Sequence, residues 1–339
     1  MGSRMIINAD SRFIPLKSET VQCVVTSPPY FGQRDYETAT WEDGDPTCGH
    51  VAYTKQNVKT NLRMDGRKHT GFYKNEKARN IEIQYKDVCK KCGAKRIDAQ
   101  IGIEKTPEEY VNNIVMVGRE INRVLKKDGV FWLNIDDCYN GSGGSGGDYA
   151  EGGIREGQPK SPGRKIKGLK NKDLIGIPWM VAFALRADGW YLRLDGIWNK
   201  PNKMPEGGAY DRPTRSHEYL FLFSKSPRYF FDLDAIAEPE KQKRRDEETG
   251  HMRRVRSVWS INTATFTGKH YAVYPEKLVE PCILAGSKKG DLVFDPFSGS
   301  GTTGRVAIRH NRQFIGTELN FHYIDELSHD RLTVQPQII

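Results

Sequence analysis

The sequence lacks long apolar runs and has few cysteines. Its mean hydropathy is −0.65, and no stretch approaches the roughly 18 consecutive apolar residues that a membrane-spanning helix requires. The N-terminal residues also lack the apolar core of a secretory signal peptide. Six cysteines among 339 residues are too few for the disulfide framework of a small secreted domain. These absences exclude the membrane-spanning and disulfide-stapled classes and predict a cytoplasmic protein.

Positive charge is in excess. The chain carries 52 Lys and Arg residues against 43 Asp and Glu residues, which gives a formal net charge of +9. This balance favours a polyanionic partner such as nucleic acid, although a basic soluble enzyme can have the same composition. A length of 339 residues accommodates one large α/β domain with insertions or two modest domains.

A short β-branched run leads into a stiff turn near the N-terminus. Residues 21–25 predict a buried central strand, and Pro28 ends it because proline has no N–H to donate. Pro29 holds Pro28 in an extended conformation. The turn presents the Ser27 hydroxyl, backbone carbonyls and the ring of Tyr30. An ordinary strand-ending turn has the same residues, so this motif alone does not identify a site.

These groups suit chemistry on an amino group attached to an aromatic base. Such a nitrogen is a poor nucleophile because its lone pair is delocalised into the ring. The Ser27 oxygen and the Pro28 carbonyl, aimed at the two N–H bonds, would draw the nitrogen toward tetrahedral geometry, while Tyr30 would stack on the base. The predicted catalysis is orientation plus electrostatic stabilisation, without a covalent intermediate.

Helical and strand patterns alternate over much of the chain. Residues 106–127 predict a helix that Asp128 and Gly129 stop before a buried strand at 130–135. This order is typical of βαβ units, so we predict an α/β fold with a mostly parallel twisted sheet and helices on both faces. The other predicted elements are a strand at 5–8, a helix at 174–187, a hairpin of strands 191–198 and 218–224 at the sheet edge, and a helix at 275–285.

A second strand-and-turn motif lies near the C-terminus. Residues 292–303 predict a buried strand, a turn containing Gly299 and Gly301, and the start of a helix. The glycines let backbone amides approach a ligand, and the helix N-terminus favours a carboxylate. The next predicted strand ends at Glu318, where an acid is suited to binding a ribose diol. A nucleoside-triphosphate loop is disfavoured because no Lys-Ser or Lys-Thr pair follows the glycines.

Residues 37–99 predict an insertion. Hydrophobic periodicity fades there, and the segment contains Cys48, His50, Cys89 and Cys92. Four such ligands in two close pairs suit a tetrahedral Zn²⁺ site of the structural type. A disordered loop with unrelated cysteines is the alternative, but a polar loop of this length would need a metal to order it.

Three further regions are rich in basic residues. Two of them, residues 140–172 and 241–256, flank the predicted hairpin, and the second precedes Trp259, which favours contact with DNA. The third lies between the two pairs of metal ligands and would face phosphate. Solvated, mobile loops are the alternative for all three. The basic residues of the third region are Lys59, Arg63, Arg67, Lys68, Lys74, Lys77 and Arg79.

Both turn motifs match one protein family. Residues 295–303 closely resemble the S-adenosylmethionine loop, and residues 26–30 the catalytic loop, of amino-group DNA methyltransferases. The catalytic loop comes first, which resembles the β-type motif order. The resemblance covers residues 5–36, 100–140 and 174–330. It implies a Rossmann-like methyltransferase fold with permuted motifs, and the predicted zinc-binding insertion lies outside the shared core.

The resemblance also assigns roles to the matching residues. Ser27, Pro28, Pro29 and Tyr30 would form the catalytic loop around the target base. Glu318 would bind the ribose of the cofactor, and Asp10 would lie near its adenine. The full set of implied cofactor-binding residues is Asp10, Thr26, Asp295, Phe297, Ser298, Gly299, Gly301, Thr302, Thr303 and Glu318.

The implied activity is methyl transfer from S-adenosylmethionine to a base flipped out of double-stranded DNA. Serine at position 27 resembles the cytosine-N4 branch, whereas the adenine-N6 branch more often has Asp or Asn there. Adenine-N6 methylation is the first alternative, followed by methylation of RNA or of a protein amide, and by a zinc-containing nucleic-acid-binding protein without activity. A cytosine-C5 mechanism is disfavoured because Cys282 lies inside an apolar helical pattern, which predicts a buried core cysteine.

The resemblance further implies a division of the chain into parts. Residues 5–36 and 100–235 would form the catalytic half, with the zinc-binding insertion at 37–99 between them. Residues 236–268 are the predicted target-recognition segment, and residues 269–332 the S-adenosylmethionine-binding half. The expected partners are double-stranded DNA and, in a restriction–modification system, a cognate endonuclease. The expected host is a bacterium or an archaeon, with a phage gene as the other source.

Overall fold

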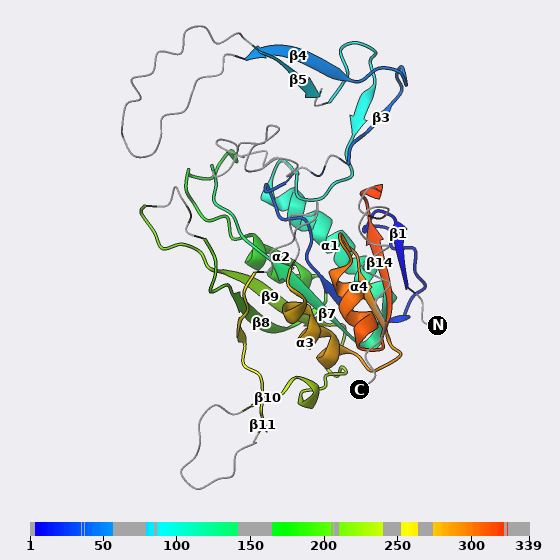
Figure 1. Ribbon diagram of the computed structural model, residues 1–339, viewed down its shortest axis with the longest axis vertical. Helices are drawn as coiled ribbons and strands as arrows, with labels where there is room; N and C mark the ends of the chain where they lie inside the picture. The colour runs from blue at the N-terminus through cyan, green and yellow to red at the C-terminus, as the bar shows by residue number, and fades with distance from the viewer. Residues whose placement is uncertain are drawn as a thin grey trace. The chain divides into compact units, whose positions relative to one another are not determined.

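A mixed sheet of eight strands forms the centre of the larger of two units into which the chain divides (Figure 1). The larger unit comprises residues 1–37 and 100–339, and the smaller unit comprises residues 38–99. The structure is a computed structural model that describes residues 4–34, 36, 38–56, 79–84, 87–141, 165–204, 206, 210–239, 252–263, 274–321 and 324.

Seven of the eight strands run in one direction, because β9 alone is antiparallel to its neighbours. This confirms the predicted mostly parallel sheet. The predicted pair of β8 and β9 forms, but β12 pairs with the outer side of β8, so that pair does not close the sheet edge. The spatial order is β1 (Arg4–Asn8), β14 (Gln313–Glu318), β13 (Leu292–Asp295), β2 (Val21–Thr26), β7 (Leu125–Ile135), β9 (His217–Ser224), β8 (Tyr191–Asn199) and β12 (Val258–Ser260).

The direction of strand succession reverses between β13 and β2. From β13 the chain passes through α4 (Thr302–Arg309) to β14 on one side, whereas from β2 it passes through α1 (Pro107–Val124) to β7 on the other. Loops that follow two such strands diverge and leave a crevice at the carboxyl edge of the sheet, where α/β proteins bind their ligands. Both motifs singled out in the sequence follow these two strands.

Helices cover both faces of the sheet, as predicted. Alternate side chains of β7 point to opposite faces, so Phe131 and Leu133 pack in one hydrophobic cluster with α1 and α2 (Ile177–Ala187). Val130 and Trp132 pack in a second cluster with α3 (Glu276–Gly286) and α4. The sheet is therefore buried on both sides, which explains its run of apolar residues.

The start of each of the first two helices follows from local chemistry. The predicted capping box opens α1, because the Thr106 hydroxyl accepts the Glu109 N–H at 3.2 Å and Glu109 accepts the Thr106 N–H at 3.2 Å. The α2 helix begins later than predicted, at Ile177, because Gly176 before it has a φ of 86°. The Asp137 carboxylate caps this helix from the end of β7 by accepting the N–H groups of Gly176 and Ile177 at 3.0 and 3.1 Å.

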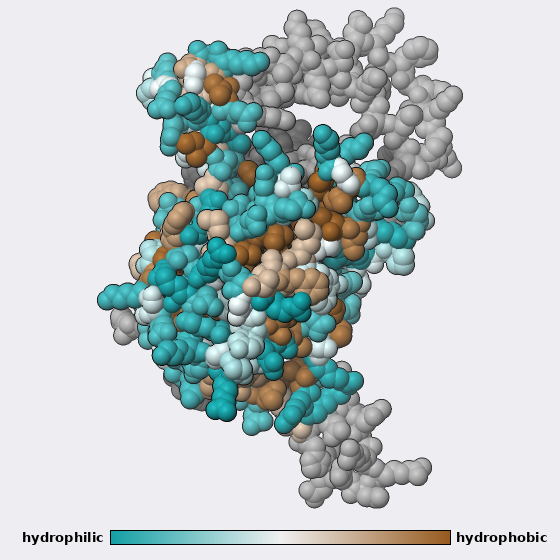
Figure 2. All heavy atoms as spheres, turned by 180° about the vertical axis from the view of Figure 1, so that it is seen from behind, coloured by the Kyte–Doolittle hydropathy of each residue, from teal (hydrophilic) through white to brown (hydrophobic). Residues whose placement is uncertain are grey.

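The surface shown in Figure 2 is largely hydrophilic, with smaller patches of hydrophobic residues among the polar ones. Among the described residues, no helix combines the length and the apolar character needed to cross a membrane. Beyond β9, the larger unit also contains a 3₁₀ turn, η1 (Asp234–Ile236), and a small antiparallel pair of strands, β10 (Glu238–Pro239) and β11 (Met252–Arg253).

The smaller unit contains two antiparallel strand pairs. These are β3 (Thr40–Glu42) with β6 (Lys95–Ile97), and β4 (Val51–Gln56) with β5 (Arg79–Gln84). In the larger unit, the two chain segments that flank the insertion are joined by Gln100. Its side chain accepts the Tyr36 N–H at 2.7 Å and donates to the Arg34 carbonyl at 2.8 Å.

Candidate active site

The two loops predicted from the sequence lie side by side at the carboxyl edge of the sheet. β2 and β13 are adjacent parallel strands, with Val24 opposite Phe294. Residues 27–30 follow β2 and residues 296–301 follow β13. Since parallel neighbours end at the same edge, the topology brings together two motifs that lie more than 260 residues apart in the sequence.

A buried carboxylate ties the two loops together. Asp295, at the end of β13, is 1% exposed, and it accepts hydrogen bonds from Thr26 Oγ1 at 2.5 Å and Thr303 Oγ1 at 2.6 Å. Tyr274 Oη and the Phe297 N–H each donate to it at 3.0 Å. Burial raises the pKa of the Asp295 carboxyl, against the lowering effect of its hydrogen bonds. The side chains of Asp295, Thr26 and Thr303, predicted to bind a cofactor, are thus turned into the protein and bond to one another.

The turn after β13 has the features of a ligand cradle. Gly299 and Gly301 have φ values of 48° and 76°, a region that glycine adopts without strain. Gly301 precedes α4, and no side chain caps that helix, so no capping oxygen offsets the positive end of the helix dipole at this turn. Ser298 Oγ is buried and has no hydrogen-bond partner among the residues that the structure describes. A side-chain methylene on Gly316 would lie 2.6 Å from that oxygen, which shows how closely the turn packs on β14.

Two acids follow the neighbouring strands at the same edge. Glu318 ends β14, is half-buried, and accepts the N–H groups of Gly299 and Asn320, each at 2.9 Å. Burial raises the pKa of the Glu318 carboxyl. Asp10 follows β1, and both of its carboxylate oxygens are engaged by the Arg12 guanidinium at 2.6–3.1 Å. Glu318 therefore faces the Gly-rich turn, whereas the Asp10 carboxylate is paired with Arg12.

The loop after β2 is held rigidly but keeps its acceptors. The Pro29 carbonyl accepts a hydrogen bond from Tyr110 Oη at 3.0 Å, while no described residue donates to the Pro28 carbonyl. Ser27 Oγ donates to Tyr30 Oη at 3.0 Å. The ring of Tyr30 is half-buried and packs against the core, so one part of it remains accessible.

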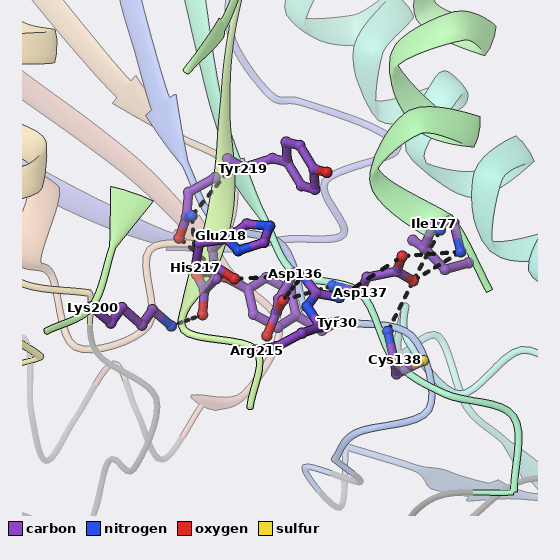
Figure 3. A network of polar contacts seen from close by, with 12 residues as sticks. Tyr30, Asp136, Asp137, Cys138, Ile177, Lys200, Arg215, His217, Glu218 and Tyr219 are labelled. Atoms are coloured by element: carbon purple, nitrogen blue, oxygen red, sulfur yellow. Dashed lines mark hydrogen bonds and ion pairs between the residues drawn. The ribbon is translucent and has the colours of Figure 1, made fainter. Parts of the chain in front are cut away.

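The Tyr30 hydroxyl enters a buried polar network that the sequence did not reveal (Figure 3). It lies 2.7 Å from Glu218 Oε2 and 3.0 Å from Asn134 Oδ1. Glu218 in turn pairs with Lys200, and each of these two side chains is 7% exposed. Burial and the charge of Glu218 raise the pKa of Tyr30 well above its ordinary value. The only sequence signal was a charged residue at the start of an apolar strand.

A second charged pair lies beside this network. Asp136, at the end of β7, accepts a hydrogen bond from Arg215 at 2.8 Å, and Figure 3 shows the pair next to Glu218. Burial and the charge of Glu218 raise the pKa of Asp136 to about 6, against the lowering effect of Arg215. Burial also lowers the pKa of His217, so the imidazole tends to be neutral.

The four predicted metal ligands come together in the smaller unit. The ligand atoms of Cys48, His50, Cys89 and Cys92 all lie within 4.8 Å of one another. Cys48 Sγ and Cys89 Sγ are 3.8 Å apart, and Cys92 Sγ and His50 Nδ1 are 3.5 Å apart. A tetrahedral zinc ion with bonds of about 2.3 Å to sulfur and about 2.0–2.1 Å to nitrogen sets these same separations at about 3.8 and 3.5 Å. The donor set and its spacing therefore fit Zn²⁺.

The surroundings of these ligands also fit a metal. Gly93 adopts a φ of 81° and donates its N–H to the Cys89 carbonyl at 2.8 Å, which closes the turn that carries two of the thiols. Backbone N–H groups of Lys91 and Cys92 donate to the Cys89 sulfur, as outer-shell donors orient metal-bound thiolates. Trp41 stacks on His50 with ring centroids 4.5 Å apart and so fixes the orientation of the imidazole.

Several predicted features lie partly or wholly outside the described residues. The basic residues between 57 and 78, the Gly-rich stretch 142–164 and the basic stretch 240–251 belong to this group. Within the described part of the target-recognition segment, Arg253 pairs with Glu238 at 3.0 Å across β10 and β11. Cys282 is 0% exposed in α3, as predicted for a core cysteine.

Comparisons with known proteins agree with this arrangement. A family model described as DNA methylase, N6_N4_Mtase, matches residues 21–329. Type II methyltransferase M.Cfr9I of Citrobacter freundii is 39% identical over 317 residues, covering 91% of this chain and 81% of that protein. Type II methyltransferase M.XycI of Xanthomonas campestris pv. cyanopsidis is 40% identical over 327 residues, covering 94% of this chain and 84% of that protein.

The fold is shared with solved structures. PvuII DNA methyltransferase (cytosine-N4-specific) matches 100% of this chain and 89% of its own with a TM-score of 0.58 at 18% identity. The Thermus thermophilus protein TTHA0409, solved with S-adenosyl-L-methionine, matches 97% of this chain and 93% of its own with a TM-score of 0.52 at 18% identity. Because the family model spans most of the sequence and the two sequence relatives are similar over nearly its whole length, the chain belongs to the N6/N4 family of DNA methylases.

Proposed function

We propose that this protein is a site-specific methyltransferase that modifies the exocyclic N4 of cytosine in duplex DNA, with S-adenosylmethionine as methyl donor. The observation that carries the proposal is the pairing of two loops at the reversal point of the sheet. One loop offers hydrogen-bond acceptors at Ser27 and Pro28, and the other offers a glycine cradle beside Glu318. Such an arrangement suits transfer of a small group between a donor and an amino group.

The cradle residues fit S-adenosylmethionine. Glu318 retains acceptor capacity for a ribose diol, because a carboxylate accepts more hydrogen bonds than the two it receives from backbone N–H groups. The uncapped start of α4 suits the carboxylate of the methionine end, and the unpaired Ser298 hydroxyl offers it a further hydrogen bond. S-adenosylmethionine would supply an activated methyl group. Phe297 is half-buried beside this turn and would pack against the ligand.

On the DNA side, the loop after β2 would receive a base flipped out of the duplex. Ser27 Oγ and the Pro28 carbonyl would accept the two amino hydrogens, while the accessible part of the Tyr30 ring would stack on the base. These bonds hold the nitrogen lone pair out of conjugation as charge develops on it. No strong base is required, since the amino proton becomes acidic only after the nitrogen has been alkylated. Serine at position 27 supports cytosine N4 over adenine N6.

The same proposal extends to the surfaces around the site. Exposed lysines at positions 165, 167, 170 and 172 follow the carboxyl end of β7 in the chain and suit phosphate contacts. Residues 236–268 would read the target sequence, between a catalytic half at 5–36 with 100–235 and a cofactor half at 269–332. The sequence relatives are named Type II methyltransferases, so the proposed partner is a cognate restriction endonuclease.

In the smaller unit we place one structural Zn²⁺ on Cys48, His50, Cys89 and Cys92, because four protein ligands leave no open position for chemistry. The test is metal analysis of purified protein, together with Cys89→Ser. The expected result is about one zinc per chain in the wild type and loss of zinc with a lower melting temperature of this unit in the variant. Protein that is free of metal and unaffected by the substitution would contradict the site.

The methylation proposal is tested with tritiated S-adenosylmethionine and unmethylated duplex DNA, followed by digestion to nucleosides, with Ser27→Ala alongside. The expected product is N4-methylcytosine, with a much lower rate in the variant. Labelled N6-methyladenine would replace cytosine by adenine as the target and leave the geometry in place. Absence of label on DNA, with RNA or protein labelled instead, would overturn the proposed substrate.

A further inference from the structure

We infer that Glu218 is a positioning residue that acts through Tyr30 to turn the Ser27 hydroxyl, so that its oxygen presents lone pairs to the target amino group. The inference rests on the proposed function, because it concerns how Ser27 meets that amino group. The residues involved come from separate parts of the chain. Ser27 and Tyr30 lie in the loop after β2, whereas Glu218 lies in β9. Figure 3 shows Tyr30 beside Glu218.

The number of hydroxyl protons sets the direction of the hydrogen bond between Ser27 and Tyr30. A tyrosine hydroxyl has one proton to donate. Tyr30 Oη lies 2.7 Å from Glu218 Oε2, 3.0 Å from Asn134 Oδ1 and 3.0 Å from Ser27 Oγ. The carboxylate and amide oxygens only accept, so whichever of them receives the Tyr30 proton, none is left for Ser27. Ser27 therefore donates its own proton to Tyr30.

The groups around Glu218 keep it an acceptor. Its Oε1 pairs with the Lys200 ammonium group, and its Oε2 accepts from Asn134 Nδ2 at 3.0 Å. Asn134 Nδ2 also donates to the Tyr219 carbonyl at 3.1 Å, which fixes the amide so that its oxygen faces Tyr30. Among the described residues, the groups that hydrogen-bond to the carboxylate are thus donors, and the buried lysine balances its charge.

The direction in which protons are donated along the hydrogen bonds from Ser27 through Tyr30 to Glu218 matters for the chemistry of the loop. The amino group of a base is a donor, so an acceptor oxygen assists it and a hydroxyl proton pointing the same way opposes it. A carboxylate accepts in every orientation, but a serine hydroxyl rotates and is both donor and acceptor. With its proton committed to Tyr30, Ser27 behaves toward the target as a pure acceptor. A serine at this position therefore depends on Tyr30 and Glu218 in a way that an aspartate would not.

The test is a double-mutant cycle of Tyr30→Phe and Ser27→Ala in the full-length protein. Rates of methyl transfer to duplex DNA are measured under single-turnover conditions with excess enzyme and tritiated S-adenosylmethionine. Tyr30→Phe removes one oxygen and keeps the ring, so we expect the rate to fall roughly 10- to 100-fold with Ser27 present. In the Ser27→Ala background the same substitution should change the rate less than about 3-fold, because the two hydroxyls act in series.

Tyr110→Phe is the matched control, since Tyr110 supports the same loop through the Pro29 carbonyl without touching Ser27. Its effect on the rate should be the same factor in both backgrounds. Calorimetric affinity for S-adenosylmethionine should be unchanged in Tyr30→Phe, because the cofactor turn lies on the other strand. An equal loss for Tyr30→Phe in both backgrounds, a wild-type rate for Tyr30→Phe alone, or weakened cofactor binding would overturn the inference.

Glu218→Gln tests the same chain from its other end. Its amide NH₂ must face a donor on one side, and when it faces Tyr30 the tyrosine accepts from it and is left with Asn134 Oδ1 or Ser27 as the acceptor of its own proton. The direction of the Ser27 proton is then less strongly fixed, so we expect a rate loss smaller than that of Tyr30→Phe, with no further loss when the two are combined. Independent, multiplying losses would contradict a serial chain. Failure of the proposed function looks different, because the wild-type protein would then label no DNA or would label adenine instead of cytosine.

Discussion

Among the buried positions at the carboxyl edge of the sheet, Asp295 is the one where we expect a substitution to lower the free energy of unfolding most. Its side chain is 1% exposed and joins the end of β2 to the turn after β13 through four donors. Replacing Asp295 with Ala removes both acceptor oxygens and leaves these donors without them. Replacing it with Asn keeps the shape and one acceptor. The pair of substitutions therefore separates the loss of hydrogen bonds from the loss of charge.

The size of the stability loss after Asp295→Ala follows from the hydrogen-bond partners that Asp295 leaves behind. After Asp295→Ala, Thr303 can turn to the Val25 carbonyl at 3.3 Å, and Tyr274 can donate to Thr303. The Phe297 N–H and the Thr26 hydroxyl have no such substitute among the hydrogen bonds of the described residues. Two stranded buried donors at about 1–3 kcal/mol each give a loss of roughly 2–6 kcal/mol in the free energy of unfolding.

Asp295→Asn should be much milder. Its amide oxygen can serve Phe297 and Thr26, and its NH₂ can donate to the hydroxyl oxygens of Thr303 and Tyr274, which rotate to accept. We expect a loss of at most about 1 kcal/mol. Denaturant unfolding followed by tryptophan fluorescence gives the free energies, and the exposed Asp195 in β8 supplies Asp195→Ala as a neutral control. A loss below 1 kcal/mol for Asp295→Ala, or equal losses for Ala and Asn, would refute the reasoning.

Three further outcomes are expected. Asp137→Ala removes the cap of α2 and should cost about 1–2 kcal/mol in denaturant unfolding, whereas an unchanged midpoint would contradict the capping role. The pKa of the Asp136 carboxyl is raised to about 6 in the folded protein, above an unfolded value of about 3.9. Protonation of Asp136 therefore stabilises the folded state. This stabilisation is full below pH ~4 and is lost as the pH rises through ~6. Relative to Asp136→Asn, the wild type should therefore lose roughly 2 kcal/mol of unfolding free energy between pH 4 and pH 8, and parallel pH curves would argue against this. Glu318→Gln should weaken calorimetric binding of S-adenosylmethionine roughly 10- to 100-fold and lower the melting temperature modestly, because its NH₂ must face the Gly299 or the Asn320 N–H, and equal affinity would remove Glu318 from the proposed cofactor site.

The positions of the two loops were predictable because each follows a short, buried, β-branched or aromatic strand and contains residues that end a strand. Pro28 and Pro29 mark the end of β2, and Gly299 and Gly301 mark the turn after β13. Such signals are local, and tertiary structure rarely overrides them. That the two loops act together was implied by the family resemblance, since β2 and β13 are not consecutive strands and the local pattern does not make them neighbours.

Side-chain direction was not predictable in the same way. Thr26, Asp295 and Thr303 were expected to bind a cofactor, but in the structure they point inward and hydrogen-bond to one another. A sequence pattern gives the element on which a residue lies and its place along it. Whether a polar side chain at a strand end turns toward a ligand or toward a neighbouring strand depends on contacts between β2, β13 and α4, which are distant in the chain.

The Glu218–Lys200 pair could not be predicted for a related reason. The two residues are 18 positions apart, and they meet because β8 and β9 pair with Trp198 opposite Glu218. The register of that pair is set by packing of both strands in the sheet. The metal ligands, in contrast, could be predicted to lie together although Cys48 and Cys89 are 41 positions apart. The chemistry of cysteine and histidine indicated a common site.

The acids at this edge of the sheet argue against a free general base. The carboxylate of Asp295 hydrogen-bonds to both loops, and that of Asp137 caps α2. The carboxylate of Glu218 is bonded to Tyr30, Asn134 and Lys200. Asp136 is paired with Arg215. In the proposed function, what faces the target is then a hydroxyl and a backbone carbonyl, whose strength as acceptors depends on orientation more than on pKa. An amino group that becomes acidic only upon alkylation needs no more than this, so the rigidity of the loop and the direction of the Ser27 proton are the properties on which the rate should depend.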